Sequence, residues 1–382
     1  MANAVRELYD KQRQAPWLDF IRRNMLNDGG LRRYVEEDGI RGVTANPTIF
    51  EKAIGAADDY DEQIAQLVRE GVKPEEMFEH VAVTDISHAA DILRPVYDSS
   101  GGSDGFVSIE VSPDKAFQTQ ATIEEVERWW RLIDRPNLMV KIPATDEGLP
   151  AIEQCIADGV NINITLIFAI EFHERVMEAY VRGLERRIEE GQDVRDSNSV
   201  ASFFVSRVDT AVDKLLDAKI EAATSEAERE KLRSLLGKGA VANAKVAYRK
   251  FQGVFGSERF KKLQAKGAKV QRPLWASTGT KNAAYSDILY VQELIGPDTV
   301  NTMPPQTIDA FRDHGVVRRT VDERYEDAER VLADLAEVNI SIKDVTDQLQ
   351  QEGVESFSTS FRGISETTAR KAAEIARKVS AA

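Results

Sequence analysis

The chain has 382 residues, 42% hydrophobic and 30% charged, so it is long and apolar enough to bury a large core and is not disordered. With 50 basic and 64 acidic residues the formal net charge is −14, which argues against a general nucleic-acid-binding surface. The single cysteine, Cys155, excludes an internal disulfide and a cysteine-based metal cluster. No signal-peptide pattern and no long uncharged apolar run are present, so we expect a cytoplasmic protein without membrane contact.

Short β-rich runs alternate with longer stretches of helical period, which is typical of a parallel sheet. The runs are WLDFI at 17–21, GVTANPT at 42–48, FVSIEV at 106–111, LMVKIPA at 138–144, NINITLIF at 161–168, VASFFVSRV at 200–208, PLWAST at 273–278 and NTMPP at 301–305. Eight such units favour a closed (β/α)8 TIM barrel over a doubly wound sheet. The dinucleotide glycine fingerprint is missing from the strand-to-helix turns, which argues against a nicotinamide enzyme.

Two gaps between the predicted strands are longer than one helix requires. The stretches 49–105 and 209–272 each hold several helical patterns, and we interpret them as helical insertions in one barrel that spans residues 1–318. Beyond residue 318 the pattern is helical, with a break predicted at the serine-rich segment 354–363. We expect residues 319–382 to form a helical extension packed on the barrel, over its mouth or its outer wall.

A lysine stands inside one predicted strand, although parallel strands are normally apolar on both faces. In LMVKIPA the alternation separates Lys141 from Val140 and Ile142, so Lys141 points into the barrel if those two residues pack on helices. A structural ion pair, or a side chain that reaches the rim, is the alternative interpretation. Because buried lysines concentrate at functional sites, we favour a catalytic residue.

Polar residues recur in the neighbouring strands. Glu110 stands 31 positions before Lys141, one β/α repeat, so both are predicted to project near the C-terminal ends of adjacent strands, where barrel active sites lie. A strand-end cap or a satisfied core hydrogen bond is the simpler explanation for any single Ser, Thr or Asn, but not for polar positions in most of the strands. The other polar positions are Asp19, Asn46, Asn161, Asn163, Thr165, Ser202 and Ser277.

This combination of side chains suits Schiff-base chemistry. A lysine amine removed from water is more easily deprotonated and attacks a carbonyl, and the protonated imine then weakens a nearby carbon–carbon bond without any metal. The proton transfers require carboxylates such as Glu110 and Asp19. Other chemistries are less supported, because the four histidines form no HExxH-like pair and neither a G-x-S-x-G elbow nor a Walker sequence occurs.

The motifs that carry these residues resemble the transaldolase family, class I aldolase-type enzymes of the pentose phosphate pathway, in its long bacterial-type form. The resemblance runs from about Trp17 to Pro305. Its motifs follow the family's order: VTANPTIF at 43–50, IEV around Glu110, MVKIPAT around Lys141, NINITLIF at 161–168, SFFVSR at 202–207 and WAST at 275–278. It implies a (β/α)8 barrel, sugar phosphate substrates, and no cofactor or metal.

The resemblance also implies catalytic roles. Lys141 matches the lysine that forms the Schiff base, and Asp19 matches the aspartate that handles the proton of the sugar hydroxyl. Glu110 matches the glutamate that works with Thr165 through a water molecule. The implied reaction transfers a dihydroxyacetone unit from fructose 6-phosphate or sedoheptulose 7-phosphate to an aldose phosphate.

Substrate-binding roles follow from the same resemblance. Asn46, Asn163 and Ser202 match residues that hydrogen-bond the dihydroxyacetone part, and Arg207 matches a phosphate-binding arginine. The family commonly shows a serine, one residue and an arginine after its seventh strand. Here Ser277 is followed four residues later by Lys281, which we expect to replace that arginine with a point charge instead of a bidentate fork.

Two alternatives stay open at the level of the sequence. A fructose-6-phosphate-type aldolase would use the same scaffold as a lyase and release free dihydroxyacetone. A barrel that binds sugar phosphates without catalysis is the other alternative, because fold alone does not define activity. A homodimer is possible, but the sequence does not determine the oligomeric state.

Overall fold

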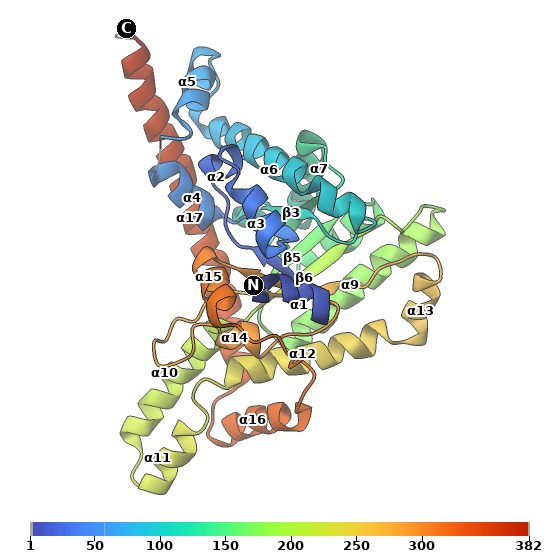
Figure 1. Ribbon diagram of the computed structural model, residues 1–382, viewed down its shortest axis with the longest axis vertical. Coiled ribbons are helices and arrows are strands. Elements are labelled where there is room, and N and C mark those ends of the chain that lie inside the picture. The colour runs from blue at the N-terminus through green and yellow to red at the C-terminus, as the bar shows by residue number, and fades with distance from the viewer. Residues whose placement is uncertain (1–2, 57, 381–382) are drawn as a thin grey trace.

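A computed structural model describes residues 3–56 and 58–380, and in it the strands form one closed parallel barrel in chain order (Figure 1). The predicted (β/α)8 TIM barrel is confirmed, since β1 pairs with both β2 and β8. The strands are β1 (Gln14–Leu18), β2 (Gly42–Thr44), β3 (Phe106–Glu110), β4 (Leu138–Pro143), β5 (Ile162–Ile167), β6 (Ser199–Phe204), β7 (Arg272–Ala276) and β8 (Thr299–Met303).

Helices surround the barrel and fill the two long gaps. The helices are α1 (Ala4–Gln12), α2 (Arg23–Asn27), α3 (Gly30–Asp38), α4 (Pro47–Ala56), α5 (Asp61–Arg69), α6 (Pro74–Ser99), the 3₁₀-helix η1 (Pro113–Lys115), α7 (Thr119–Ile133), α8 (Gly148–Ala157), α9 (Ile170–Glu189), α10 (Ser206–Ala222), α11 (Glu226–Arg233), α12 (Gly239–Phe255), α13 (Glu258–Gln264), α14 (Leu289–Gln292), α15 (Pro305–His314), α16 (Tyr325–Glu337) and α17 (Ile342–Ser380). In the described part of the chain, no helix is both long enough and apolar enough to span a membrane.

The first strand lies earlier in the chain than the sequence pattern suggests. β1 begins at Gln14, which reads as a loop residue, and ends at Leu18, so the predicted strand at 17–21 was wrong in both bounds. Gln14 is buried, and its side-chain amide donates to the carbonyl of Leu294 and to the hydroxyl of Thr299. These bonds satisfy the buried amide nitrogen on the strand face opposite to Trp17, whereas the amide oxygen has no hydrogen-bond partner among the described residues. Asp19 consequently lies just beyond the C-terminal end of β1.

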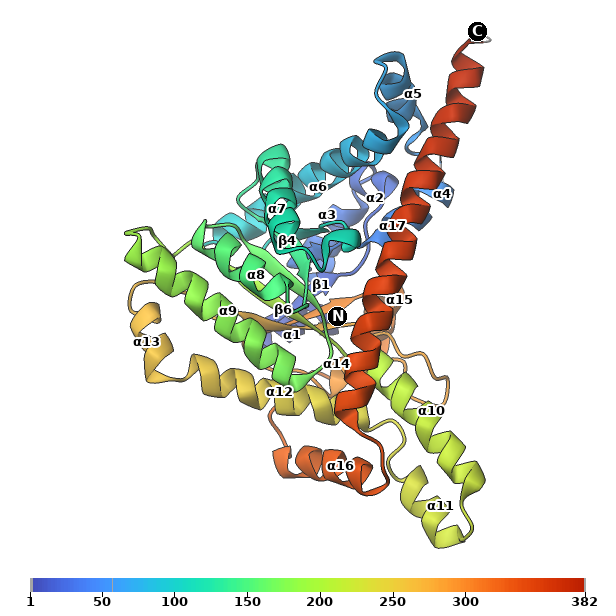
Figure 2. The same ribbon diagram turned by 180° about the vertical axis from the view of Figure 1, so that it is seen from behind.

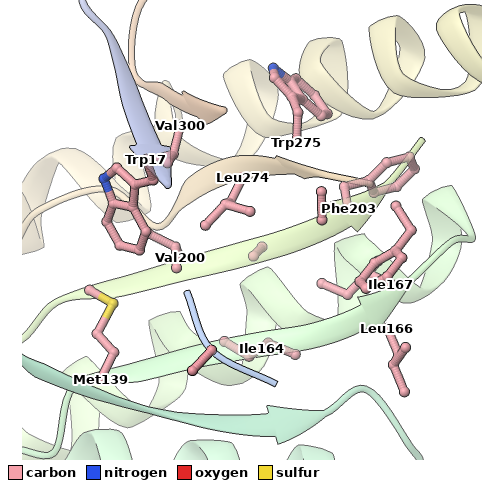
Figure 3. Packing of buried hydrophobic residues seen from close by; sticks show 14 of the residues in the cluster. Trp17, Met139, Ile164, Leu166, Ile167, Val200, Phe203, Leu274, Trp275 and Val300 are labelled. Atoms are coloured by element: carbon pink, nitrogen blue, oxygen red, sulfur yellow. The ribbon is translucent and has the colours of Figure 1, made fainter. Parts of the chain in front are cut away.

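Apolar side chains fill the barrel beneath its polar upper layer. Trp17, Met139, Val200 and Leu274 are buried and gather between the strands (Figure 3). Because side chains two residues apart share a face of a strand, Met139 lies one layer below Lys141 on β4, and Val200 lies one layer below residue 202 on β6. The candidate site therefore rests on a hydrophobic floor.

The last helix, α17, is continuous over 39 residues and runs along one side of the molecule (Figure 2). The predicted break at 354–363 was wrong, because tertiary contacts outweigh the weak helix propensity of this serine-rich segment. Val354 and Phe357 are buried, and the Ser360 hydroxyl lies 2.9 Å from that of Thr48 on α4. The helix packs on α4, α5 and α6. The division of the chain at residue 318 stays a prediction.

Candidate active site

A cavity of about 490 Å³ opens at the C-terminal ends of the strands. Eight of the ten residues predicted for the site lie on its wall: Asp19, Asn46, Lys141, Thr165, Ser202, Arg207, Ser277 and Lys281. The other two, Glu110 and Asn163, lie behind this wall, where they contact Lys141 and Ser202 respectively. The strand ends therefore bring all ten predicted residues into one cluster.

Lys141 and Glu110 form a buried ion pair at the base of the cavity. They are register partners on β4 and β3, and the Nζ atom lies 3.1 Å from Oε2. Lys141 is 5% exposed and Glu110 is 6% exposed. The Lys141 ammonium also donates to the Ala45 carbonyl at 3.4 Å. The ion pair considered as the alternative from the sequence is thus present, but the amine still faces the cavity.

The Glu110 carboxylate is poorly solvated. Apart from its contact with Lys141, no described residue forms a hydrogen bond to either of its oxygens. Burial raises the pKa of Glu110 above its usual value, although the lysine charge opposes this effect. A raised pKa brings a carboxyl group closer to the range in which it can both donate and accept a proton. The buried hydroxyl of Thr165 also lacks a hydrogen-bond partner among the described residues.

Asp19 supplies the second carboxylate. Its Oδ1 accepts a hydrogen bond of 2.6 Å from the Thr44 hydroxyl, which also lies 2.7 Å from the hydroxyl of Thr302. Burial raises the pKa of Asp19, whereas the Thr44 hydrogen bond and the charges of Lys141 and Lys281 lower it. Two carboxyl groups with raised pKa values therefore flank one amine.

Amide and hydroxyl groups from β5, β6 and the end of β2 form another part of the site. Asn163 is fully buried; its amide donates to the Ser108 hydroxyl at 3.1 Å, and its oxygen accepts from Ser202 at 2.7 Å. Asn46 lines the cavity and also caps α4, since its side-chain oxygen accepts from the N–H of Ile49 at 3.0 Å. Ser202 and Asn46 thus present fixed polar groups to the cavity.

Several cationic side chains line the cavity. Arg207, in the first turn of α10, and Lys281, in the loop after β7, line the wall without an ion-pair partner among the described residues. Lys52 and Arg22 lie there as well, and Arg22 is paired with Asp59 at 2.9 Å. The cavity therefore favours an anionic group on its ligand, although the whole chain is acidic.

The backbone is strained where two strands end at the site. Ser277 has φ 56° and Leu166, next to Thr165, has φ 60°, and both values lie in the left-handed region that residues other than glycine rarely adopt. The pairing of β5 with β6 shifts register between Ile164 and Ile167. Such strain is concentrated at functional sites, where it directs particular side chains.

Comparisons with known proteins show the family of the chain. A family model described as Transaldolase/Fructose-6-phosphate aldolase matches residues 16–368. The chain belongs to this family. Curated relatives named transaldolase include those of Parafrankia sp. (48% identical over 354 residues, 92% of this chain and 94% of the relative), Frankia alni (46% over 372 residues, 97% and 98%) and Trichodesmium erythraeum (45% over 353 residues, 92% and 93%).

The family match extends well past residue 305, where the resemblance of the motifs ends, and includes α16 and most of α17. Phe357 of α17 lines the cavity and is 4% exposed. No local pattern in the sequence signals this position, because the helix returns to the mouth of the barrel from far along the chain. Thr44 was also missed, although it lies two residues before Asn46 at the end of the same strand.

Histidines and metal ligands do not contribute to this site. His173 is buried on α9, and its ring packs against that of Phe203 with 5.6 Å between the ring centroids. In the part of the chain that the structure describes, His, Cys, Asp and Glu side chains form no group of three that could hold a metal ion. The site is thus built from an amine, carboxylates, hydroxyls, amides and cations.

Proposed function

We propose that this protein is a transaldolase that transfers a dihydroxyacetone unit from a ketose phosphate to an aldose phosphate through a Schiff base on Lys141. The observation that carries the proposal is the buried Lys141 amine on the cavity wall, with Glu110 at 3.1 Å and the Asp19 carboxylate on the same wall. This arrangement combines a nucleophile with two groups for proton transfer in a site with little access for water.

The first half of the reaction forms the covalent intermediate. The neutral amine of Lys141 attacks the C2 carbonyl of the ketose phosphate, and the carbinolamine then loses water to give the protonated imine. Glu110 supplies and removes the protons, with Thr165 holding a water molecule between them. The raised pKa of Glu110 supports this role.

Cleavage and transfer follow at the same amine. Asp19 takes the proton of the C4 hydroxyl as the C3–C4 bond breaks, and the electron pair moves to the imine nitrogen to give an enamine. The aldose phosphate that forms leaves the site. The enamine carbon then attacks the carbonyl of a second aldose phosphate, Asp19 returns the proton, and hydrolysis of the new imine releases the product from Lys141.

Substrate recognition uses the two ends of the cavity. Asn46, Asn163 and Ser202 orient the dihydroxyacetone part. Arg207, Ser277 and Lys281 bind the phosphate group, and this assignment is supported by the two cations, which have no ion-pair partner among the described residues. Fructose 6-phosphate and sedoheptulose 7-phosphate are the proposed donors, which places the protein in the pentose phosphate pathway. A cytoplasmic location and a homodimer stay predictions.

The matched family also contains fructose-6-phosphate aldolases, so the competing activity is a lyase. The experiment mixes fructose 6-phosphate with the enzyme, with and without erythrose 4-phosphate, and measures sedoheptulose 7-phosphate and free dihydroxyacetone. We expect turnover that depends on the acceptor, with little free dihydroxyacetone. Rapid release of dihydroxyacetone without an acceptor would establish the lyase instead.

A further inference from the structure

Two carboxylates outside the catalytic cluster lie one turn apart on α10. Asp209 is 1% exposed and Asp213 is 7% exposed. Burial raises the pKa of both, to about 6 for Asp209. Because burying a carboxylate is costly, each of these groups must be offset by its contacts. Neither residue lines the catalytic cavity, so their contacts have to be explained in another way.

Each carboxylate joins α10 to two other segments. Asp209 accepts from the N–H of Ala240 at 2.7 Å through Oδ1 and from the Tyr290 hydroxyl at 3.0 Å through Oδ2. Asp213 repeats this arrangement with the N–H of Gly237 at 3.0 Å and the Tyr285 hydroxyl at 2.7 Å. One oxygen of each group therefore holds the start of α12, and the other holds the segment that contains both tyrosines.

A third link lies closer to the cavity. The hydroxyls of Ser206 and Ser277 are 2.9 Å apart, and the N–H of Ser206 donates to the Ser277 carbonyl at 3.1 Å. The loop of residues 277–288 is thus fixed to α10 at Ser277 and again at Tyr285. Lys281 stands between these two anchors, four residues from each, and its side chain is exposed to the cavity opening.

The other cation of the proposed phosphate site belongs to α10 itself, since Arg207 lies in its first turn. We propose that Asp213 and Tyr285, supported by Asp209 and Tyr290, are positioning residues that hold the 277–288 loop so that Lys281 and Arg207 act on the same phosphate. This inference rests on the proposed function. A lysine is a point charge on a flexible stem, so its effect depends on where the loop places it.

The test removes the Tyr285 hydroxyl and compares KM for an acceptor that carries a phosphate with KM for one that does not. Tyr285→Phe keeps the ring that packs against Gly237 and removes only the hydrogen bond to Asp213. We expect KM for glyceraldehyde 3-phosphate to rise about three- to tenfold with kcat nearly unchanged. KM for unphosphorylated glyceraldehyde should not change. Asp213→Asn should show the same pattern.

A matched control removes another tyrosine hydroxyl that donates a hydrogen bond. Tyr248 on α12 donates to the Pro297 carbonyl at 3.0 Å and does not line the cavity. Tyr248→Phe should lower thermal stability by about as much as Tyr285→Phe does. It should leave KM unchanged for both the phosphorylated and the unphosphorylated acceptor. An equal rise in KM for both acceptors in Tyr285→Phe, or no rise at all, would overturn the positioning role.

Combination with Lys281→Ala separates this inference from the proposed function. If Tyr285 acts through Lys281, Tyr285→Phe adds no further rise in KM once Lys281 is alanine. If Lys281→Ala raises KM whereas Tyr285→Phe does not, the positioning role is wrong and the phosphate site stands. If Lys281→Ala leaves KM unchanged, both the phosphate role of Lys281 and the positioning role are wrong. If the unmodified protein shows no transferase activity at all, the proposed function itself is contradicted.

Discussion

Lys141 and Glu110 face each other across adjacent strands, and their charged groups are 3.1 Å apart inside the barrel. Burying this ion pair costs free energy, because both ions are removed from water. The attraction between the two charges offsets part of that cost. In the proposed mechanism this one contact serves both catalysis and stability.

Removing the Lys141 amine alone should abolish turnover and also lower the stability of the fold. Lys141→Met should abolish turnover and leave the Glu110 carboxylate buried without a counter-ion, at a cost of about 3 kcal/mol in the free energy of unfolding. Lys141→Met combined with Glu110→Gln should stay inactive but recover most of that loss. Urea denaturation at pH 7.5 measures the difference. A double variant as unstable as the single one would show that Glu110 is not the source of the cost.

The hydrogen bond from Thr44 should set the pH dependence of the reaction through Asp19. This bond lowers the pKa of Asp19, so Thr44→Val should raise that pKa further. Since a base acts in its ionised form, the acid limb of kcat should move to higher pH, with little change on the alkaline side. Thr278→Val, which removes a buried hydroxyl bonded to Asn301, is the control. If the acid limb of kcat lies at the same pH in both variants, the Thr44 hydroxyl does not set the pH dependence of the reaction.

Phe357 should protect the intermediate from water. It is the side chain that α17 contributes to the cavity wall, and Gln350, two turns earlier, donates to the Ala144 carbonyl near the end of β4. Phe357→Ala should increase free dihydroxyacetone several-fold in the absence of an acceptor, because water gains access to the imine. Phe361→Ala is the matched control, since Phe361 packs on Phe78 outside the cavity. Equal release from both variants would indicate general loosening of α17.

Buried His173 should make the protein sensitive to acid. Burial lowers its pKa from 6.5 to about 4, so the unfolded chain binds the proton first as the pH falls. Its contribution to stability is complete above about pH 6.5 and is lost progressively as the pH falls towards 4. Between pH 7.5 and 5 the unmodified protein should lose about 2 kcal/mol more than His173→Leu. His80→Gln, a change at an exposed position on α6, should behave like the unmodified protein in the same urea titrations.

Strand alternation was sufficient to predict the part of the cluster that lies within the strands, whereas Arg207 and Lys281 followed only from the resemblance to the family. Side chains alternate with a period of two, so a charge within an apolar strand has one direction in which it can avoid the helices. Lys141 and Glu110 followed this rule. Thr165 also lies on the cavity wall, but the left-handed backbone at Leu166 interrupts the alternation directly after it.

Features that depend on distant packing could not be predicted in this way. Phe357 reaches the cavity only because α17 folds back over the barrel, and the continuity of that helix depends on its contacts with α4, α5 and α6. The start of β1 was missed because Gln14 is polar, and its buried hydrogen bonds become visible only in three dimensions. Local patterns do not report either kind of contact.

The central claim is that Lys141 forms the Schiff base, and borohydride trapping tests it most directly. The enzyme is incubated with fructose 6-phosphate, reduced with borohydride, digested and examined by mass spectrometry. Lys52 and Lys281 line the same cavity and serve as internal controls. We predict a three-carbon adduct on Lys141 and an unmodified amine on the other two lysines. An unmodified Lys141, or an adduct on Lys52 or Lys281 in its place, would contradict the account.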